Sequence, residues 1–195
     1  MTYYAQFDLH SGATFRSDTR IYLNGNPASQ TDGDCVAAIV GKNPGSASSA
    51  TTGTWESLDL TGDKMLPSVG NRFIEAYKLA RKTIPKFAFV RVWNLFYLCD
   101  ENLGSALDAI NKISSPLICS SENNIPEIVW FAWGNDDINL NPFKNRFLSM
   151  RIVHAFFFDK QNDKICARCP TRASFAKHPQ GLPAQPVIEH LAKIL

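Results

Sequence analysis

Four short apolar runs alternate along the chain with segments of helical periodicity. The runs cover residues 35–41, 87–95, 128–134 and 152–158; all are rich in β-branched or aromatic residues and bounded by polar or turn residues. Near-continuous apolar runs of this length are typical of strands buried on both faces of a parallel sheet. We therefore expect these runs to form a central, mainly parallel, four-stranded sheet.

The segments between the runs have the spacing of amphipathic helices. Residues 70–83 place Phe73, Ile74 and Tyr77 on one face, at spacings of three and four. Further helices are expected at residues 103–113, 139–150 and 184–195. This alternation predicts an α/β fold with three layers, α/β/α, over residues 35–195. Residues 1–34 are expected to form a polar arm or a β-hairpin packed on that domain.

Composition narrows the class of protein. Hydrophobic residues make up 45% and charged residues 19% of the 195 residues, which is an ordinary globular balance. No apolar run reaches the ~20 residues that a membrane span needs, and the N-terminal residues lack the pattern of a secretory signal. The five cysteines are scattered and odd in number. We expect a reduced, cytoplasmic monomer with no membrane partner.

Polar residues whose side chains could take part in binding or catalysis follow the apolar runs. Asn43 lies in the Gly-Lys-Asn-Pro-Gly loop after the first run, Asn94 is at the end of the second, and His178 precedes the last helix. Each has an ordinary explanation alone: a turn, a cap or a loop histidine. In parallel sheets, however, ligands bind beyond the carboxyl ends of the strands. Their joint placement predicts a site at that edge.

The same segments resemble the motifs of the uracil-DNA glycosylase superfamily. GKNPGSASSATTG followed by PSVGNRF is similar to its first motif, and VWNLFYL to the strand whose Asn reads the flipped base. IVWFAWGN is similar to a strand of the uracil-specific branch, and KHPQGLPAQP to the closing motif. The chain also resembles a bacterial and phage family of unknown function with NPS, NLF and HP motifs. Its closing motif departs from that of the uracil-DNA glycosylase superfamily at Gln180 and Gly181, where many members have Ser-Pro.

The resemblance implies a monofunctional DNA glycosylase that flips a nucleotide out of the helix and hydrolyses its N-glycosidic bond. Asn43 would position the water, His178 would donate to the base oxygen, and Asn94 would bind the base edge. Trp55 and Phe73 are both candidates for stacking on the base. No metal or cofactor is implied, and the lone Cys-x-x-Cys pair at 166 and 169 falls short of the four ligands of a zinc site.

Gly45 suggests which base is removed. In the strict uracil branch a tyrosine stands at this place and blocks substituents at C5 of the pyrimidine. Glycine would leave that space open, so the resemblance points to a C5-modified or mismatched pyrimidine, in phage defence or in repair. Gly45 also has a purely structural explanation as a turn residue.

Several residues are predicted to contact DNA. Ser68, Asn71 and Arg72 are expected at the start of the first helix, where the backbone amides would bind a phosphate. Lys177 and Gln180 are expected to contact the DNA as well. Leu182 is either a wedge that fills the place of the flipped base or a buried contact. Basic residues cluster in residues 72–91 and 164–177. These clusters either contact DNA phosphates or form a solvent-exposed face.

Two other functions stay open from the sequence. One is a non-catalytic member of the fold that only binds nucleic acid. The other is a hydrolase of free nucleosides or nucleotides, which would need neither a wedge nor the basic clusters.

Overall fold

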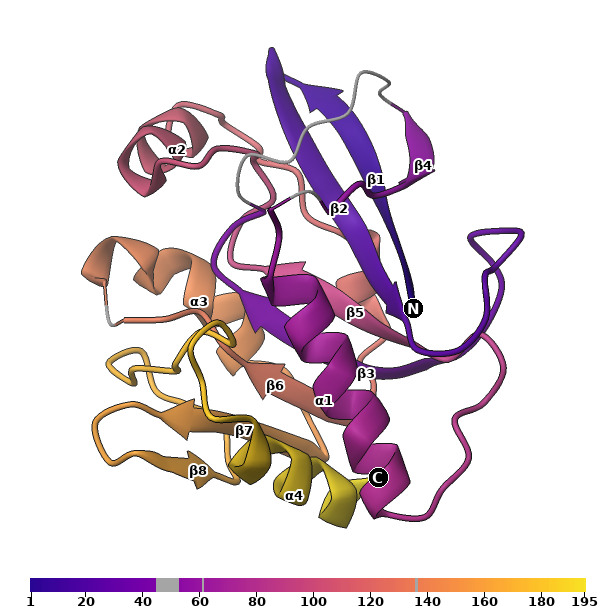
Figure 1. The fold of residues 1–195 in the computed structure, drawn as a ribbon. Helices are drawn as coiled ribbons and strands as arrows, with labels where there is room; N and C mark the ends of the chain where they lie inside the picture. Colours follow the sequence, from indigo (N-terminus) through magenta and orange to yellow (C-terminus); the bar gives the residue numbers. More distant parts are fainter. Residues whose placement is uncertain (45–52, 61, 136) are drawn as a thin grey trace.

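The computed structural model describes residues 1–44, 53–60, 62–135 and 137–195 (Figure 1). They form one mixed sheet in the strand order β4-β1-β2-β5-β3-β6-β7-β8. The strands are β1 (Thr2–His10), β2 (Ala13–Tyr22), β3 (Cys35–Gly41), β4 (Thr54–Ser57), β5 (Phe89–Asn94), β6 (Ile128–Phe131), β7 (His154–Asp159) and β8 (Lys164–Cys166). The α-helices are α1 (Met65–Leu79), α2 (Leu103–Ile110), α3 (Asn141–Leu148) and α4 (Ala184–Ile194). Short 3-10 turns occur at Ser120–Asn123 and Ile138–Leu140.

The sheet has eight strands in the described part of the chain, not the expected four. Strands β5, β3, β6 and β7 pair in parallel, whereas β2 joins β5, β1 joins β2, β4 joins β1 and β8 joins β7, all antiparallel. Of the two alternatives for the first 34 residues, the structure has the hairpin, which extends the sheet. Hydrophobic patterning did not indicate that β2 belongs to the central sheet, because five consecutive polar residues, 16–20, are buried within it.

Helices cover both faces of the sheet. Val90 and Val92 of β5 pack in one cluster with residues of α1 and α4, while Trp93 packs on the opposite face with residues of α2 and α3. This alternation follows from the two-residue period of a strand. Figure 1 shows α1 and α4 side by side over the same face. In the described ranges no helix combines the length and apolar character needed to cross a membrane.

Helix α1 begins five residues earlier than the sequence pattern indicates. Its first amides, Met65 N and Leu66 N, donate to Asp63 Oδ1 at 2.7 and 3.3 Å. The proline at position 67 is compatible with a first helical turn. Because the helix starts at Met65, Ser68 and Arg72 do not open it, and the favourable place for an anion holds the carboxylate of Asp63.

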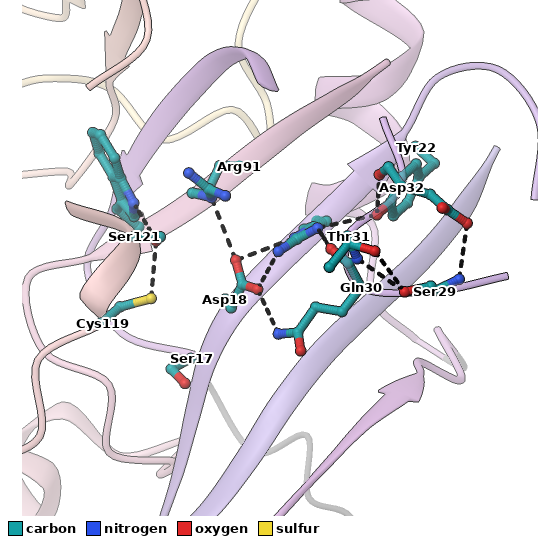
Figure 2. A network of polar contacts seen from close by, with 12 residues as sticks. Ser17, Asp18, Tyr22, Ser29, Gln30, Thr31, Asp32, Arg91, Cys119 and Ser121 are labelled. Carbon is teal, nitrogen blue, oxygen red and sulfur yellow. Dashed lines mark hydrogen bonds and ion pairs between the residues drawn. The ribbon is translucent and has the colours of Figure 1, made fainter. Parts of the chain in front are cut away.

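A buried charge cluster fastens the hairpin to the central strands (Figure 2). Arg20 of β2 contacts Asp18 through two bonds, Nη2–Oδ2 at 2.6 Å and Nε–Oδ1 at 3.2 Å. Arg91 of β5 places Nε 3.3 Å from Asp18 Oδ1, and Gln30 Nε2 donates to Oδ2 at 2.9 Å. Asp18 has a φ of 43°, in the left-handed region that Asp tolerates better than most residues. One carboxylate thus joins two strands and the following loop.

Asp18→Asn tests this joint, because asparagine keeps the shape and the backbone preference but removes the charge. Two buried guanidinium groups would lose their counter-ion, so we expect a loss of about 3–5 kcal/mol in the free energy of unfolding. Urea denaturation would measure it. The control Asp108→Asn, at an exposed position of α2, should stay within about 0.5 kcal/mol of the wild type. A similarly small loss for Asp18→Asn would show that the cluster does not hold the hairpin.

Candidate functional site

The carboxyl ends of β3 and β5 meet at one edge of the sheet. Their parallel register places Gly41 beside Asn94. A side chain at position 41 would stand 2.9 Å from Asn94 Oδ1, so glycine is needed there for Asn94 to keep its orientation. Asn94 follows Val90 and Val92 in the strand alternation and therefore points to the α1 and α4 face.

The amide of Asn94 is buried without a partner. The residue is 1% exposed, and neither Nδ2 nor Oδ1 has a hydrogen bond within the described ranges. Buried polar groups are almost always paired, and each unsatisfied one costs about 1–3 kcal/mol. Asn94 therefore presents one acceptor and a donor group, side by side, to a missing partner at this edge.

The backbone at Asn94 is held from the other face of the sheet. Arg146 of α3 donates from Nη2 to Asn94 O at 2.7 Å and from Nη1 to Leu95 O at 2.5 Å. Its Nε lies 2.8 Å from Glu122 Oε2, and the Tyr97 hydroxyl donates to Oε1 of the same carboxylate at 2.5 Å. Burial raises the pKa of Tyr97 well above its ordinary value, and the charge of Glu122 adds to this. These hydrogen bonds join Arg146, Glu122 and Tyr97 to one another and to backbone carbonyl groups, and none of them involves the Asn94 side chain.

Asn43 stands in the loop that follows β3. Its Nδ2 donates to Asp100 O at 2.7 Å, which fixes the orientation of the amide. No residue of the described ranges bonds to its Oδ1, so that oxygen is available as an acceptor. The loop is further anchored by Leu95 N, which donates to Gly41 O at 3.0 Å. Asn43 and Asn94 thus come from adjacent strands, as the sequence predicts.

His178 is half-buried in the loop before α4. Its Nδ1 accepts from Gln180 N at 3.3 Å, so the neutral ring carries its proton on Nε2. Burial lowers the pKa of His178 below the usual histidine value, and the positive charge of Lys42 lowers it further, while Asp63 opposes them. At neutral pH the ring is therefore an uncharged donor through Nε2–H.

Lys42 is the residue of this edge that sequence reasoning missed. Its Nζ donates to Asn135 Oδ1 at 3.4 Å, which ties the loop after β3 to the end of β6. Burial lowers the pKa of Lys42, and Asp137 partly offsets the shift. The signal was its place between Gly41 and Asn43. Lys177, which the sequence predicts to contact DNA, places its ammonium 5.7 Å from the centre of the Phe158 ring.

Neither aromatic candidate is free to stack on a base. Phe73 is fully buried between α1 and the sheet. Trp55 lies on β4, stacked on Tyr4 with 4.2 Å between ring centroids. Three strands separate β4 from β3, a span of about 19 Å at the usual strand spacing. Strand order, which no local pattern encodes, thus keeps Trp55 from Asn43.

Arg72 positions the closing loop. It is buried, and its Nη2 donates to Leu182 O at 2.6 Å and to Pro179 O at 3.3 Å, while Nη1 donates to Ser68. Leu182 is itself buried with the α1 and α4 residues, so of its two interpretations the structure has the buried contact. Asn71 and Gln180 are exposed. Gly45 lies outside the described residues.

The basic cluster of residues 72–91 does not reach this edge as one surface. Arg72 and Arg91 are buried. Four exposed basic residues of this cluster remain, at the carboxyl end of α1 and just beyond it: Lys78, Arg81, Lys82 and Lys86. The amino end of α1 lies next to Asp63, and its 15 residues span about 22 Å. These basic residues therefore lie about one helix length away from Asn43 and His178.

Comparison with known proteins finds no matching family model, no similar curated protein and no solved structure with a matching fold. All five cysteines are free. Within the described ranges no three His, Cys, Asp or Glu side chains are grouped so that they could hold a metal ion. The residues at the carboxyl ends of β3 and β5 and in the loop before α4 are therefore the basis for proposing a function.

Lys42→Met should raise the pKa of His178. Removing the nearby positive charge favours the protonated ring, whereas the contribution of burial remains, so the pKa should rise without losing its whole depression. Titration of the imidazole signals by NMR would measure this. Lys112→Met, at an exposed site after α2, should leave the value unchanged. An unmoved His178 in the Lys42 variant would mean that burial alone sets its pKa.

Proposed function

We propose that the protein is a monofunctional DNA glycosylase that hydrolyses the N-glycosidic bond of a modified or mismatched pyrimidine. The observation that carries this proposal is the buried, unpaired amide of Asn94. A pyrimidine edge offers a donor or acceptor at each position next to its ring nitrogen, and one side-chain amide can meet two of them. The motif resemblance to the uracil-DNA glycosylase superfamily supports the same assignment.

The proposed hydrolysis does not need a strong base to deprotonate the attacking water. Asn43 Oδ1 would accept a hydrogen bond from the attacking water and orient it, because an amide cannot take its proton. The water oxygen bonds to C1′ of the sugar as the C1′–N bond breaks, and the base leaves with the bonding electrons. His178 Nε2–H would stabilise the negative charge that develops on the base oxygen. The released anion and the water proton are then neutralised by solvent.

A neutral His178 suits this role better than a charged one. Protonation would place a charge in a buried ring and, secondly, next to the positive charge of Lys42, and the lowered pKa of His178 reflects both costs. A neutral donor that is already oriented needs no proton transfer before the base departs. Repair of deaminated bases and removal of modified phage bases would both use this activity.

One observation favours a second candidate, a hydrolase of free nucleotides. Leu182 is buried and Phe73 is enclosed in the core, so neither of these two candidates is exposed as a wedge or as a stacking ring. An enzyme that takes free nucleotides needs no wedge, because it has no duplex to open. Base release from a duplex oligonucleotide and from a mononucleotide, compared side by side, separates the two functions.

Asn43→Ala should reduce base release by about 100-fold or more while DNA binding stays within a few fold. Positioning the water stabilises the transition state and not the bound substrate. Counting abasic sites in modified duplexes, together with fluorescence anisotropy for binding, would test it. If release and binding fail together, the lost bond to Asp100 has disturbed the loop, and the role in catalysis is unsupported.

Gly45→Tyr tests the choice of base. We expect it to exclude C5-substituted pyrimidines by steric overlap and to spare activity on unsubstituted uracil relatively well. A clash can discriminate by more than the ~1–3 kcal/mol of one missing methylene contact. Gly45→Ala controls for the backbone with the least added bulk. An active alanine variant and a tyrosine variant that loses both substrates equally would contradict the open-pocket hypothesis.

A further inference from the structure

Arg16 of β2 is a buried cation that has no ion pair among the described residues. The residue is 3% exposed, and its Nε has no hydrogen-bond partner in that part of the chain. No carboxylate of the described ranges lies at ion-pair distance from its guanidinium. Arg20, four residues later on the same strand, shares Asp18 with Arg91. The strand thus carries one neutralised arginine and one that is not.

Arg16 faces the candidate site. Phe15 packs with the α2 and α3 residues, so the alternation of the strand directs Arg16 to the opposite face, the one to which Asn94 points. Arg16 N donates to Tyr97 O, and Asn43 Nδ2 donates to Asp100 O, so both residues bind one short segment that follows β5. Only β5 lies between β2 and β3, which puts the two strands about 10 Å apart.

The groups around Arg16 do not neutralise it. Burial lowers the pKa of Arg16, and only partly do the charges of Cys99 and Asp63 oppose this. Burial also raises the pKa of the Cys99 thiol to about 11, so at neutral pH it carries no charge. The Asp63 carboxylate acts from beyond ion-pair distance and already accepts two amides of α1. A guanidinium stays protonated even so, and leaving it unpaired is costly.

We propose that Arg16 binds a phosphate oxyanion of the substrate. The planar guanidinium presents paired N–H donors that match two oxygens of a phosphate. A distance of about 10 Å between its strand and that of Asn43 suits a phosphate next to the nucleotide whose base meets Asn94. The assignment rests on the proposed function for its substrate, but binding of an anion by Arg16 is measurable without catalysis.

The first test is thermal denaturation with inorganic phosphate, against sodium chloride at equal ionic strength. Phosphate should raise the wild-type midpoint saturably, because it binds the folded state alone. Arg16→Met should unfold at a higher temperature than the wild type without phosphate, since an unpaired buried charge is gone, and should not respond to phosphate. The control Arg151→Met, at an exposed position, should respond as the wild type does.

Two results would overturn the assignment: no phosphate response in the wild type, or an equal response in Arg16→Met. Should the methionine variant not fold, Arg16→Lys keeps the charge but loses the paired donors. Its phosphate dissociation constant should rise about tenfold, as expected for the loss of one charge-assisted hydrogen bond. An unchanged constant in Arg16→Lys would count against recognition by the guanidinium.

The second test identifies the source of the phosphate. A single-stranded oligodeoxynucleotide and a 5′-mononucleotide are titrated against the wild type and Arg16→Met. If the phosphate belongs to a nucleic-acid strand, the salt slope of oligonucleotide binding should fall by about 0.7 in the variant. If it belongs to a free nucleotide, only mononucleotide binding should weaken. Equal binding of both ligands by both proteins would overturn the assignment.

Failure of the proposed function would look different. Phosphate binding that depends on Arg16, with no base released from any duplex or nucleotide, would sink the glycosylase assignment and leave the anion site intact. Base release that depends on Asn43, with phosphate binding unchanged in Arg16→Met, would do the reverse.

Discussion

The parallel register of β3 against β5 is the constraint on which the rest of the candidate site depends. It places Gly41 beside Asn94, and the missing side chain at position 41 gives the Asn94 amide its space. Because both strands end at the same level, the Asn43 side chain donates a hydrogen bond to Asp100 O. The segment after β5 also accepts a hydrogen bond from β2, at Tyr97 O. A slip of one residue would turn Asn94 to the other face of the sheet.

Buried polar groups give this fold its particular character. Two networks are paired: Asp18 with its two arginines, and Glu122 with Arg146 and Tyr97. Both attach outlying elements to β5, the first the hairpin and the second α3. Among the described residues, the Asn94 amide and Arg16 Nε belong to the buried polar atoms that have no hydrogen-bond partner. Unpaired burial costs stability, so under the proposed function a ligand bound at this edge would supply partners to these two groups.

The candidate site therefore combines rigid supports with unsatisfied side chains. Arg146 holds the backbone of Asn94, Arg72 holds the loop that carries His178, and Lys42 links two strand ends. Such supports fix functional groups before a ligand arrives, which lowers the cost of organising them in the bound state. Burial lowers the pKa of His178 and the charge of Lys42 lowers it further, so Lys42 serves both geometry and electrostatics.

By itself the sequence determined the apolar strands of the sheet, an α/β class and the placement of Asn43 and Asn94 at the carboxyl ends of two of those strands, because burial periodicity and chain order are local properties. His178 lies in the loop between β8 and α4. Tertiary structure decided what local patterns do not carry. The sequence left a hairpin as one of two alternatives for residues 1–34. It did not indicate that β2 pairs with β5, because the buried side chains of β2 are largely polar and its partner strand lies far along the chain. Strand order removed Trp55 from the site, and packing enclosed Phe73 and Leu182. Arg16 became significant only once its burial, and the absence of an ion pair to it among the described residues, were known, since both depend on neighbours distant in sequence.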